Sequence, residues 1–329
     1  METIVDRLAQ HAHNTPNTPA MWYKSGHSWK HFTWSAYFDK VKDFAGALLE
    51  FGYEPSDAIS IMGNNSPEWV IADVAAMAIR CVPAGIYQTC TPEQASYIVN
   101  HSESRVLVIE DFEIWNHLGL PDNFSMFENV EVIVAIRDAE MINHDKVISF
   151  DAFCERGKDR HSDVLERLAA CEPNDLATLI YTSGTTGPPK GVMLSHDNLA
   201  WTSKQATDVV GEIQSDQDCI VSYLPLSHIA EQMFSIHLPI TAGVPIWFAE
   251  SMLKLKDALV IARPAIFLGV PRVWEKFKSA LETRLDEATG VKKAIVDFSR
   301  ATLLECGHII IREGIESLTI SQRAKYEIA

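Results

Sequence analysis

The sequence predicts an α/β fold in which mostly parallel sheets are flanked by helices. Residues 58–62, 105–110 and 130–136 are short apolar runs without polar alternation, as expected of strands that are buried on both faces. Helix signals lie between these runs, and strands that alternate with helices form parallel sheets. Of the 329 residues, 47% are hydrophobic and 22% are charged, so the chain can bury a sizeable core and is neither disordered nor collagen-like.

The first helices are marked by their capping residues. Between Thr33 and Gly52 apolar side chains recur at helical spacing, with Thr33 as N-cap and Gly52 just past the end. Ser66 caps a second helix, which has Pro67 at its first position and extends to about Arg80.

The same order of strand and helix then repeats. Residues 82–87 predict a strand. Thr91 and Gln94 form a capping box, with Pro92 in the first turn, for a helix that extends to about His101.

The second half of the chain continues this alternation. Residues 154–174 are polar and predict a helix with a linker, and residues 176–182 predict a strong strand that runs straight into a loop. The remaining predicted elements are a helix from about His196, strands at 219–223, 244–249 and 265–269, a helix from about Ile229 to Thr241, and mostly helical structure from Pro271 to Ala329.

The charge balance excludes one class of partner. Lys and Arg number 28 and Asp and Glu number 44, so the formal net charge is −16. This charge excludes nucleic acid as a partner that is bound by the overall electrostatic field of the protein, because nucleic-acid binding depends on Lys and Arg side chains that neutralise phosphates. An anionic ligand therefore needs local hydrogen-bond donors.

The sequence predicts a cytoplasmic protein. Its cysteines lack C-x-x-C pairs and zinc-site spacing, so they are expected to be reduced thiols. The N-terminus has no basic head followed by an apolar run, and the most apolar stretch, residues 70–87, is interrupted by Asp73 and Arg80. We therefore expect neither a signal peptide nor a membrane span. The six cysteines are Cys81, Cys90, Cys154, Cys171, Cys219 and Cys306.

The loop that follows the strand at 176–182 has the composition of a polyphosphate site. Glycines let backbone N–H groups approach phosphate oxygens, hydroxyl groups add donors, and a lysine adds a positive charge. The spacing differs from the Walker pattern, because two prolines separate Gly187 from Lys190 and no Ser or Thr follows the lysine. The alternative interpretation is an ordinary surface turn, since the same residue types populate turns. The candidate phosphate-binding residues are Thr182, Ser183, Gly184, Thr185, Thr186, Gly187, Pro188, Pro189 and Lys190.

The order of these residues resembles a family signature. Residues 181–191 read Y-T-S-G-T-T-G-P-P-K-G and match nine of eleven positions in the phosphate-binding motif of the adenylate-forming superfamily. The stretch SPEWVIADVAAMAIRCVPAGIYQTCTPEQASYIVNHSESRVLVIED, the motif LPLSHIAEQ (224–232) and the motif GVPRVWEK (269–276) resemble long-chain fatty acid:CoA ligases of the bubblegum type. The first of these stretches contains no evident catalytic group, and we interpret it as helix and strand packing.

The resemblance implies a two-step reaction. A long-chain fatty acid attacks the α-phosphorus of ATP with Mg²⁺ to give acyl-AMP, and coenzyme A then displaces AMP. His228 corresponds to the family position that lines the acyl-adenylate pocket, although a histidine there could instead cap a helix or sit in the core. Arg272 and Trp274 could lie near the acyl passage, but we favour packing for Trp274.

Several motifs of the family are absent from this sequence. We find no Tyr-Gly-x-Thr-Glu, no Thr-Gly-Asp and no C-terminal domain with a catalytic lysine between Phe277 and Ala329. We therefore expect residues 1–329 to be an incomplete N-terminal domain of the adenylate-forming fold, that is, a partial large AMP-binding domain without its second part and without the small C-terminal domain. The isolated chain is expected to be inactive.

Two alternative functions stay open at this point. The chain could belong to a ligase that adenylates another carboxylic acid, or it could be a non-catalytic nucleotide-binding or interaction module. A fatty substrate also leaves open a peripheral contact with a membrane.

Overall fold

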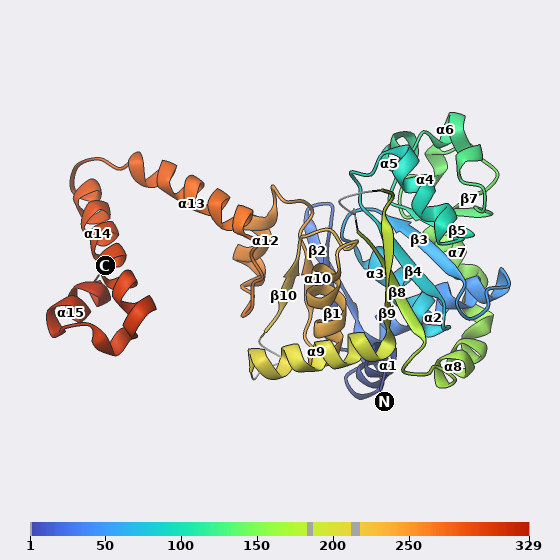
Figure 1. Cartoon of the computed structure of the whole chain (residues 1–329), viewed down its shortest axis with the longest axis horizontal. Coiled ribbons are helices and arrows are strands. Elements are labelled where there is room, and N and C mark those ends of the chain that lie inside the picture. The colour runs from blue at the N-terminus through green and yellow to red at the C-terminus, as the bar shows by residue number, and fades with distance from the viewer. Residues whose placement is uncertain (1, 183–186, 212–217, 329) are drawn as a thin grey trace. The chain divides into compact units, whose positions relative to one another are not determined.

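The computed structural model describes residues 2–182, 187–211 and 218–328. The chain divides into two compact units, Met1–Phe267 and Leu268–Ala329. All strands of the described ranges belong to the larger unit, and the smaller unit is helical (Figure 1).

The main sheet confirms the predicted parallel arrangement. In the described ranges it has seven strands in the order β7-β6-β5-β3-β4-β8-β9. All neighbouring pairs are parallel except β8 and β9, which form an antiparallel hairpin. Every residue of β3, β4 and β5 is buried, as the absence of polar alternation predicted. The strands are β3 (Ala58–Met62), β4 (Val82–Ile86), β5 (Val106–Ile109), β6 (Val132–Ala135), β7 (Val147–Ser149), β8 (Leu176–Thr182) and β9 (Lys190–Ser195).

A second, smaller sheet has the order β10-β11-β1-β2. The pair β1–β2 is an antiparallel hairpin, whereas β11 is parallel to both β1 and β10. This hairpin is not among the predicted elements, because β2 is mostly polar and both strands are only partly buried. The strands are β1 (Pro19–Ser25), β2 (Ser28–Thr33), β10 (Ile220–Ser222) and β11 (Ile246–Phe248).

The predicted helix starts are confirmed. The side chains of Thr33 and Ser66 accept hydrogen bonds from the backbone of the first turn, and Thr91 and Gln94 form the expected capping box. The helices of the larger unit are α1 (Ile4–Asn14), α2 (Trp34–Glu50), α3 (Pro67–Ala78), α4 (Pro92–His101), α5 (Phe112–His117), α6 (Leu120–Asn123), α7 (Phe150–Gly157), α8 (His161–Ala169), α9 (His196–Val210), α10 (Ile229–Gln232), α11 (Leu238–Ala242) and α12 (Leu255–Ala262), with the π-helical turn η4 (Met233–His237) and the 3₁₀ turns η1 (Phe124–Met126), η2 (Ala139–Met141) and η3 (Lys158–Arg160).

The strand predicted at residues 265–269 is wrong. This segment has no regular secondary structure and pairs with no strand of the described ranges. An apolar composition favours burial, but a strand also needs a neighbouring backbone with which to exchange hydrogen bonds. Phe267 instead packs through its side chain, and its ring stacks on Tyr223 with the centroids 5.5 Å apart.

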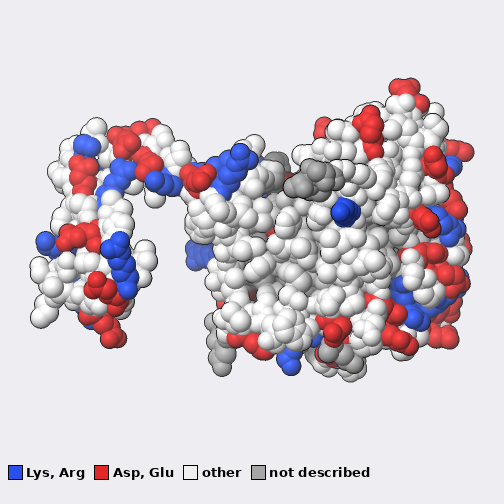
Figure 2. Space-filling view, viewed as in Figure 1, with Lys and Arg blue, Asp and Glu red and all other residues white. Residues whose placement is uncertain are grey.

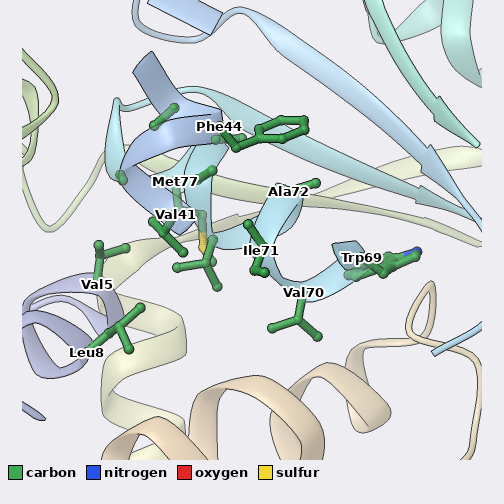
Figure 3. Packing of buried hydrophobic residues seen from close by; sticks show 14 of the residues in the cluster. Val5, Leu8, Val41, Phe44, Trp69, Val70, Ile71, Ala72 and Met77 are labelled. Atoms are coloured by element: carbon green, nitrogen blue, oxygen red, sulfur yellow. The ribbon is translucent and has the colours of Figure 1, made fainter. Parts of the chain in front are cut away.

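The core of the larger unit is centred on helix α3. Eleven of its twelve residues are buried, because helices pack around it and the main sheet lies beside it. In Figure 3, side chains of α1, such as Val5 and Leu8, and of α2, such as Val41 and Phe44, surround those of α3. This packing places the N-terminus of α3 at the carboxyl end of β3.

The smaller unit consists of α13 (Pro271–Asp286), α14 (Gly290–Glu313), the 3₁₀ turn η5 (Ile315–Ser317) and α15 (Ile320–Ile328). The helical prediction for this region is confirmed. The Cys306 thiol of α14 is buried and donates a hydrogen bond to the Gln322 carbonyl of α15. Across the described part of the whole chain, no helix combines the length and apolarity needed to cross a membrane.

Candidate functional site

Strand β8 carries the predicted phosphate loop at its carboxyl end. Tyr181 is buried and Thr182 is exposed, so the chain leaves the core at this point. Strand β9 returns antiparallel, and Thr182 pairs in register with Lys190. Thr182 and Lys190, which bracket the predicted loop in the sequence, are therefore held side by side.

The structure describes five of the nine predicted loop residues. Thr182, Gly187, Pro188 and Lys190 are exposed and Pro189 is half-buried. Gly187 has a φ of +97°, in the left-handed region that favours glycine. Lys190 forms no ion pair with any described residue. The other four predicted residues, Ser183, Gly184, Thr185 and Thr186, lie outside the described residues.

Few other charged side chains surround this loop. In Figure 2, the middle of the face that carries β8 and β9 is sparsely charged, whereas acidic side chains gather along the side that carries α6, α7 and α8. A phosphate ligand on this face would therefore meet few described carboxylates, although the net charge is −16.

The segment with His228 reaches the same end of the main sheet. A Cβ atom added to Gly85 of β4 would come within 2.9 Å of the Ser227 Cα, so the segment packs directly on the strand. Gly85 is the register partner of Ile180, and Ile180 lies two residues before Thr182. Segments far apart in sequence are thus brought together at the carboxyl ends of β4 and β8.

His228 is the N-cap of α10. Its side chain is exposed, and its Nδ1 atom accepts a hydrogen bond of 3.1 Å from the backbone N–H of Ala230. This geometry confirms the capping interpretation. The role of His228 in an acyl-adenylate pocket stays a prediction.

A buried carboxylate holds the His228 segment in place. Glu231 Oε1 accepts hydrogen bonds from the Ser222 hydroxyl (2.9 Å), the Tyr223 N–H (2.9 Å) and the Ser235 hydroxyl (2.6 Å). Burial raises the pKa of Glu231, and these hydrogen bonds oppose the rise. The carboxylate therefore fixes the chain between β10 and α10.

Asn65 extends this network to the main sheet. Its side-chain amide follows β3 and donates hydrogen bonds of 2.7 Å to the Ser222 hydroxyl and to the Leu224 carbonyl. It also lies 3.3 Å from Glu231 Oε1. The network thus joins the carboxyl ends of β3 and β10, one from each sheet.

Two cavities flank the segment that follows β4. One has a volume of about 290 Å³ and extends to Pro189 of the loop. The other has a volume of about 250 Å³ and extends to Pro225 of the His228 segment. Tyr87 and Thr89 line both cavities. The carboxyl ends of parallel strands are the usual position of ligand sites in open α/β sheets, so this end of the molecule is the candidate site.

Clusters of metal ligands are absent from the described residues. These residues contain no group of three or more His, Cys, Asp or Glu side chains that could hold a metal ion. Mg²⁺ stays a prediction from the family resemblance.

Trp274 lies in the smaller unit. It is half-exposed, and its indole N–H donates a hydrogen bond of 2.8 Å to the Gly269 carbonyl. Its ring also meets Phe277 edge to face, with the centroids 6.1 Å apart. These contacts are local to residues 269–277, and packing of the helix against a sheet stays a prediction. The position of Arg272 relative to an acyl passage stays untested.

Three residues at the site are not among those predicted from the sequence: Asn65, Glu231 and His101, whose Nδ1 atom lies 2.8 Å from the Tyr181 hydroxyl. Glu231 stands in the motif LPLSHIAEQ, where a charged residue three positions after a cap could have indicated a buried partner. Nothing local to Asn65 or His101 marks them, because their partners lie far away in the sequence.

Comparison with known proteins identifies the family of this chain. The family model described as AMP-binding enzyme matches residues 8–310. Long-chain-fatty-acid–CoA ligase ACSBG2 of Rattus norvegicus is 36% identical over 315 residues, which cover 88% of this chain and 47% of that protein. ACSBG1 of Bos taurus is 34% identical over 277 residues, which cover 80% of this chain and 37% of that protein. The chain thus spans about half the length of the curated relatives it matches, or less.

Solved structures show the same fold at low sequence identity. The A-PCP didomain of carboxylic acid reductase from Segniliparus rugosus, in complex with AMP, matches 91% of this chain and 47% of its own chain with a TM-score of 0.74 and 18% identity. The anthranilate CoA ligase AuaEII, in complex with anthranoyl-AMP, matches 80% of this chain and 49% of its own chain, with a TM-score of 0.69 and 20% identity. The predicted α/β fold is therefore confirmed for most of the chain.

Proposed function

This chain belongs to the AMP-binding enzyme family, and from that premise we propose that it contributes the phosphate-binding part of a long-chain fatty acid:CoA ligase. The observation that carries the proposal is the β8–β9 hairpin. It presents Thr182, Gly187 and Lys190 at the carboxyl end of the main sheet, beside the cavity that Pro189 lines.

The proposed reaction has two steps. A carboxylate oxygen of the fatty acid forms a bond to the α-phosphorus of ATP, and the bond to pyrophosphate breaks. The thiol sulfur of coenzyme A then forms a bond to the acyl carbon, its proton is lost, and AMP leaves. The first step joins two anions, so neutralisation of charge on the departing phosphates lowers its barrier.

The residues of this chain act on the phosphates. Lys190 supplies a positive charge without a competing ion pair in the described part of the chain, and the hydroxyl of Thr182 stands opposite it in the hairpin. Glu231 and Asn65 keep the His228 segment against β4. His228 would then face the acyl-adenylate with its Nε2 atom, because Nδ1 is used by the helix cap.

The remaining parts of the proposal rest on the family and the composition. ATP, Mg²⁺ and coenzyme A are the expected small-molecule partners, together with a long-chain fatty acid. Residues 1–329 are proposed to form part of the large AMP-binding domain. A cytoplasmic location, with peripheral contact to the membrane that supplies the fatty acid, belongs to the same proposal.

The first experiment measures ATP binding by calorimetry in the presence of Mg²⁺, with the 329-residue chain and with Lys190→Ala. Loss of one charged hydrogen bond to phosphate should weaken binding about tenfold or more. Lys204→Ala is the matched control, because Lys204 is an exposed lysine of α9. Helix α9 follows Ser195, which pairs with Leu176 at the end of β8 away from the loop.

The substrate class needs a second assay. ATP-dependent pyrophosphate release is measured with palmitate, benzoate and an amino acid, each with and without coenzyme A. Release that depends on palmitate supports the fatty acid assignment, and release with benzoate alone supports another carboxylic acid. A chain that binds ATP and releases no pyrophosphate with any acid behaves as expected of an inactive part of the ligase. A folded chain that binds no ATP, or binds it equally well with Lys190→Ala, contradicts the phosphate site.

A further inference from the structure

Tyr181, the first residue of the loop motif, is held by a side chain from another part of the fold. Its hydroxyl lies 2.8 Å from Nδ1 of His101, the last residue of α4. The two rings meet edge to face, with centroids 5.8 Å apart and an interplanar angle of 85°. This contact joins the crossover between β4 and β5 to the strand that carries the loop.

Tyr181 is able to act as the donor of this hydrogen bond through its phenol. Its side chain is 3% exposed, and burial raises the pKa of Tyr181 to about 12, so the phenol keeps its proton at neutral pH. The phenol can therefore donate to Nδ1 of His101 in the tautomer that leaves this nitrogen without a proton.

The contact is closely packed on both sides. The ring of Tyr97 stacks on His101, with centroids 5.3 Å apart, which limits the rotation of the imidazole. Across the hairpin, a Cβ atom on Gly191 would come within 3.3 Å of the Tyr181 ring. Tyr181 and Pro189 also line the same cavity. The position of the Tyr181 ring therefore affects both strands at the base of the loop.

We propose that His101 is a positioning residue for the phosphate loop and that it acts through Tyr181. This inference rests on the proposed function, because it assumes that the loop holds the phosphates of a nucleotide. His101 does not touch the phosphates in this account. It sets where β8 and β9 leave the sheet, and thereby sets the spacing of the donors at Thr182 and Lys190.

The test compares ATP binding in the presence of Mg²⁺ among matched variants of the 329-residue chain. His101→Phe keeps a ring but removes the acceptor, and Tyr181→Phe removes the donor. His101→Asn places an oxygen where Nδ1 lies and should restore the hydrogen bond. His13→Phe, at an exposed histidine of α1, is the control for the substitution itself.

We expect His101→Phe and Tyr181→Phe each to weaken ATP binding about three- to tenfold, as the loss of one hydrogen bond implies. The double variant should be no weaker than the single ones, because both remove the same contact. His101→Asn should bind within about twofold of the wild type, and His13→Phe should bind as the wild type does. The melting temperature of each variant is measured as well as the affinity for ATP. If His101 had a purely structural role, the variants would have a lower melting temperature and an unchanged affinity.

Two results would overturn the inference in different ways. In the first, the wild-type chain binds ATP, and either both Phe variants bind it equally well or the losses of affinity of the two variants add in the double variant. His101 then does not position the loop, and the proposed function stands. If the folded wild-type chain binds no ATP, the proposed phosphate site fails and this inference fails with it. If His101→Phe does not fold, His101→Asn and Tyr181→Phe still decide between these results.

Discussion

The most direct stability prediction concerns Asp73, which lies in the middle of α3. Its side chain is fully buried, and neither carboxylate oxygen has a hydrogen-bond partner among the described residues. Burial raises the pKa of Asp73 to about 8, because an ionised carboxylate is poorly solvated in the core. Asp73→Asn replaces the group by a neutral one of nearly the same shape.

The magnitude follows from proton linkage. The unfolded chain has a pKa near ~3.9 at this residue, so between about pH 4 and pH 8 the folded chain holds a proton that the unfolded chain has released. The folded state binds more protons, and its stability therefore falls as the pH rises, by about 1.4 kcal/mol per pH unit. From pH 5 to pH 7 the wild type should lose about 2.7 kcal/mol relative to Asp73→Asn.

Urea unfolding at pH 5, 6 and 7, followed by tryptophan fluorescence, measures this difference. Other titrating groups contribute equally to both chains, so they cancel in the comparison. Asp208→Asn, at an exposed residue of α9, should show the same pH dependence as the wild type. The reasoning is refuted if the free energies of unfolding of wild type and Asp73→Asn run parallel with pH.

Further substitutions at three positions test the geometry. Glu231→Ala should lower the free energy of unfolding by about 3 kcal/mol or more, because it leaves the buried hydroxyls of Ser222 and Ser235 without their acceptor. Glu231→Gln should lower the free energy of unfolding less. Urea unfolding of both variants measures the difference. Gly187→Ala should destabilise the folded chain by about 1–2 kcal/mol, since a φ of +97° is strained for alanine. An unchanged midpoint of urea unfolding would contradict this expectation. Gly307→Ala, inside α14 where no atom lies within 4 Å of the added methyl group, should instead stabilise its helix by about 0.5–1 kcal/mol, which a rise in melting temperature would reveal.

The elements that the sequence predicts well are those specified by local chemistry. The caps at Thr33, Ser66 and Thr91 depend on side chains within one turn of the helix. The strands of the main sheet depend on continuous apolar runs. The prediction at 265–269 failed because strand formation depends on a neighbouring backbone, which the segment itself does not encode. Strand β9 was not predicted, because half of its residues are exposed and it therefore lacks a continuous apolar run.

The candidate site shows the same division. The residue types of the loop indicate phosphate chemistry without any knowledge of the fold, because glycine, hydroxyl and lysine act locally on an anion. The residues that hold the loop and the His228 segment carry no such local sign. His101 and its partner Tyr181 are 80 residues apart, and Asn65 and Ser222 are 157 apart. Their roles depend on the strand order, which only the structure provides.

The strand order also explains why these distant residues meet where they do. Strands β4 and β8 are parallel neighbours, so the chain that leaves β4 must pass beside the loop that leaves β8. Residues 87–101 form this exit and include Tyr87, Thr89 and His101, which line the cavity beside Pro189 or bind Tyr181. The stretch that we interpreted from its sequence as packing therefore also forms a wall of the candidate site. If the loop binds nucleotide, backbone amides in residues 87–101 should become more protected from hydrogen exchange together with those of residues 181–191, whereas the amides of β6 and β7, at the far edge of the sheet, should not change.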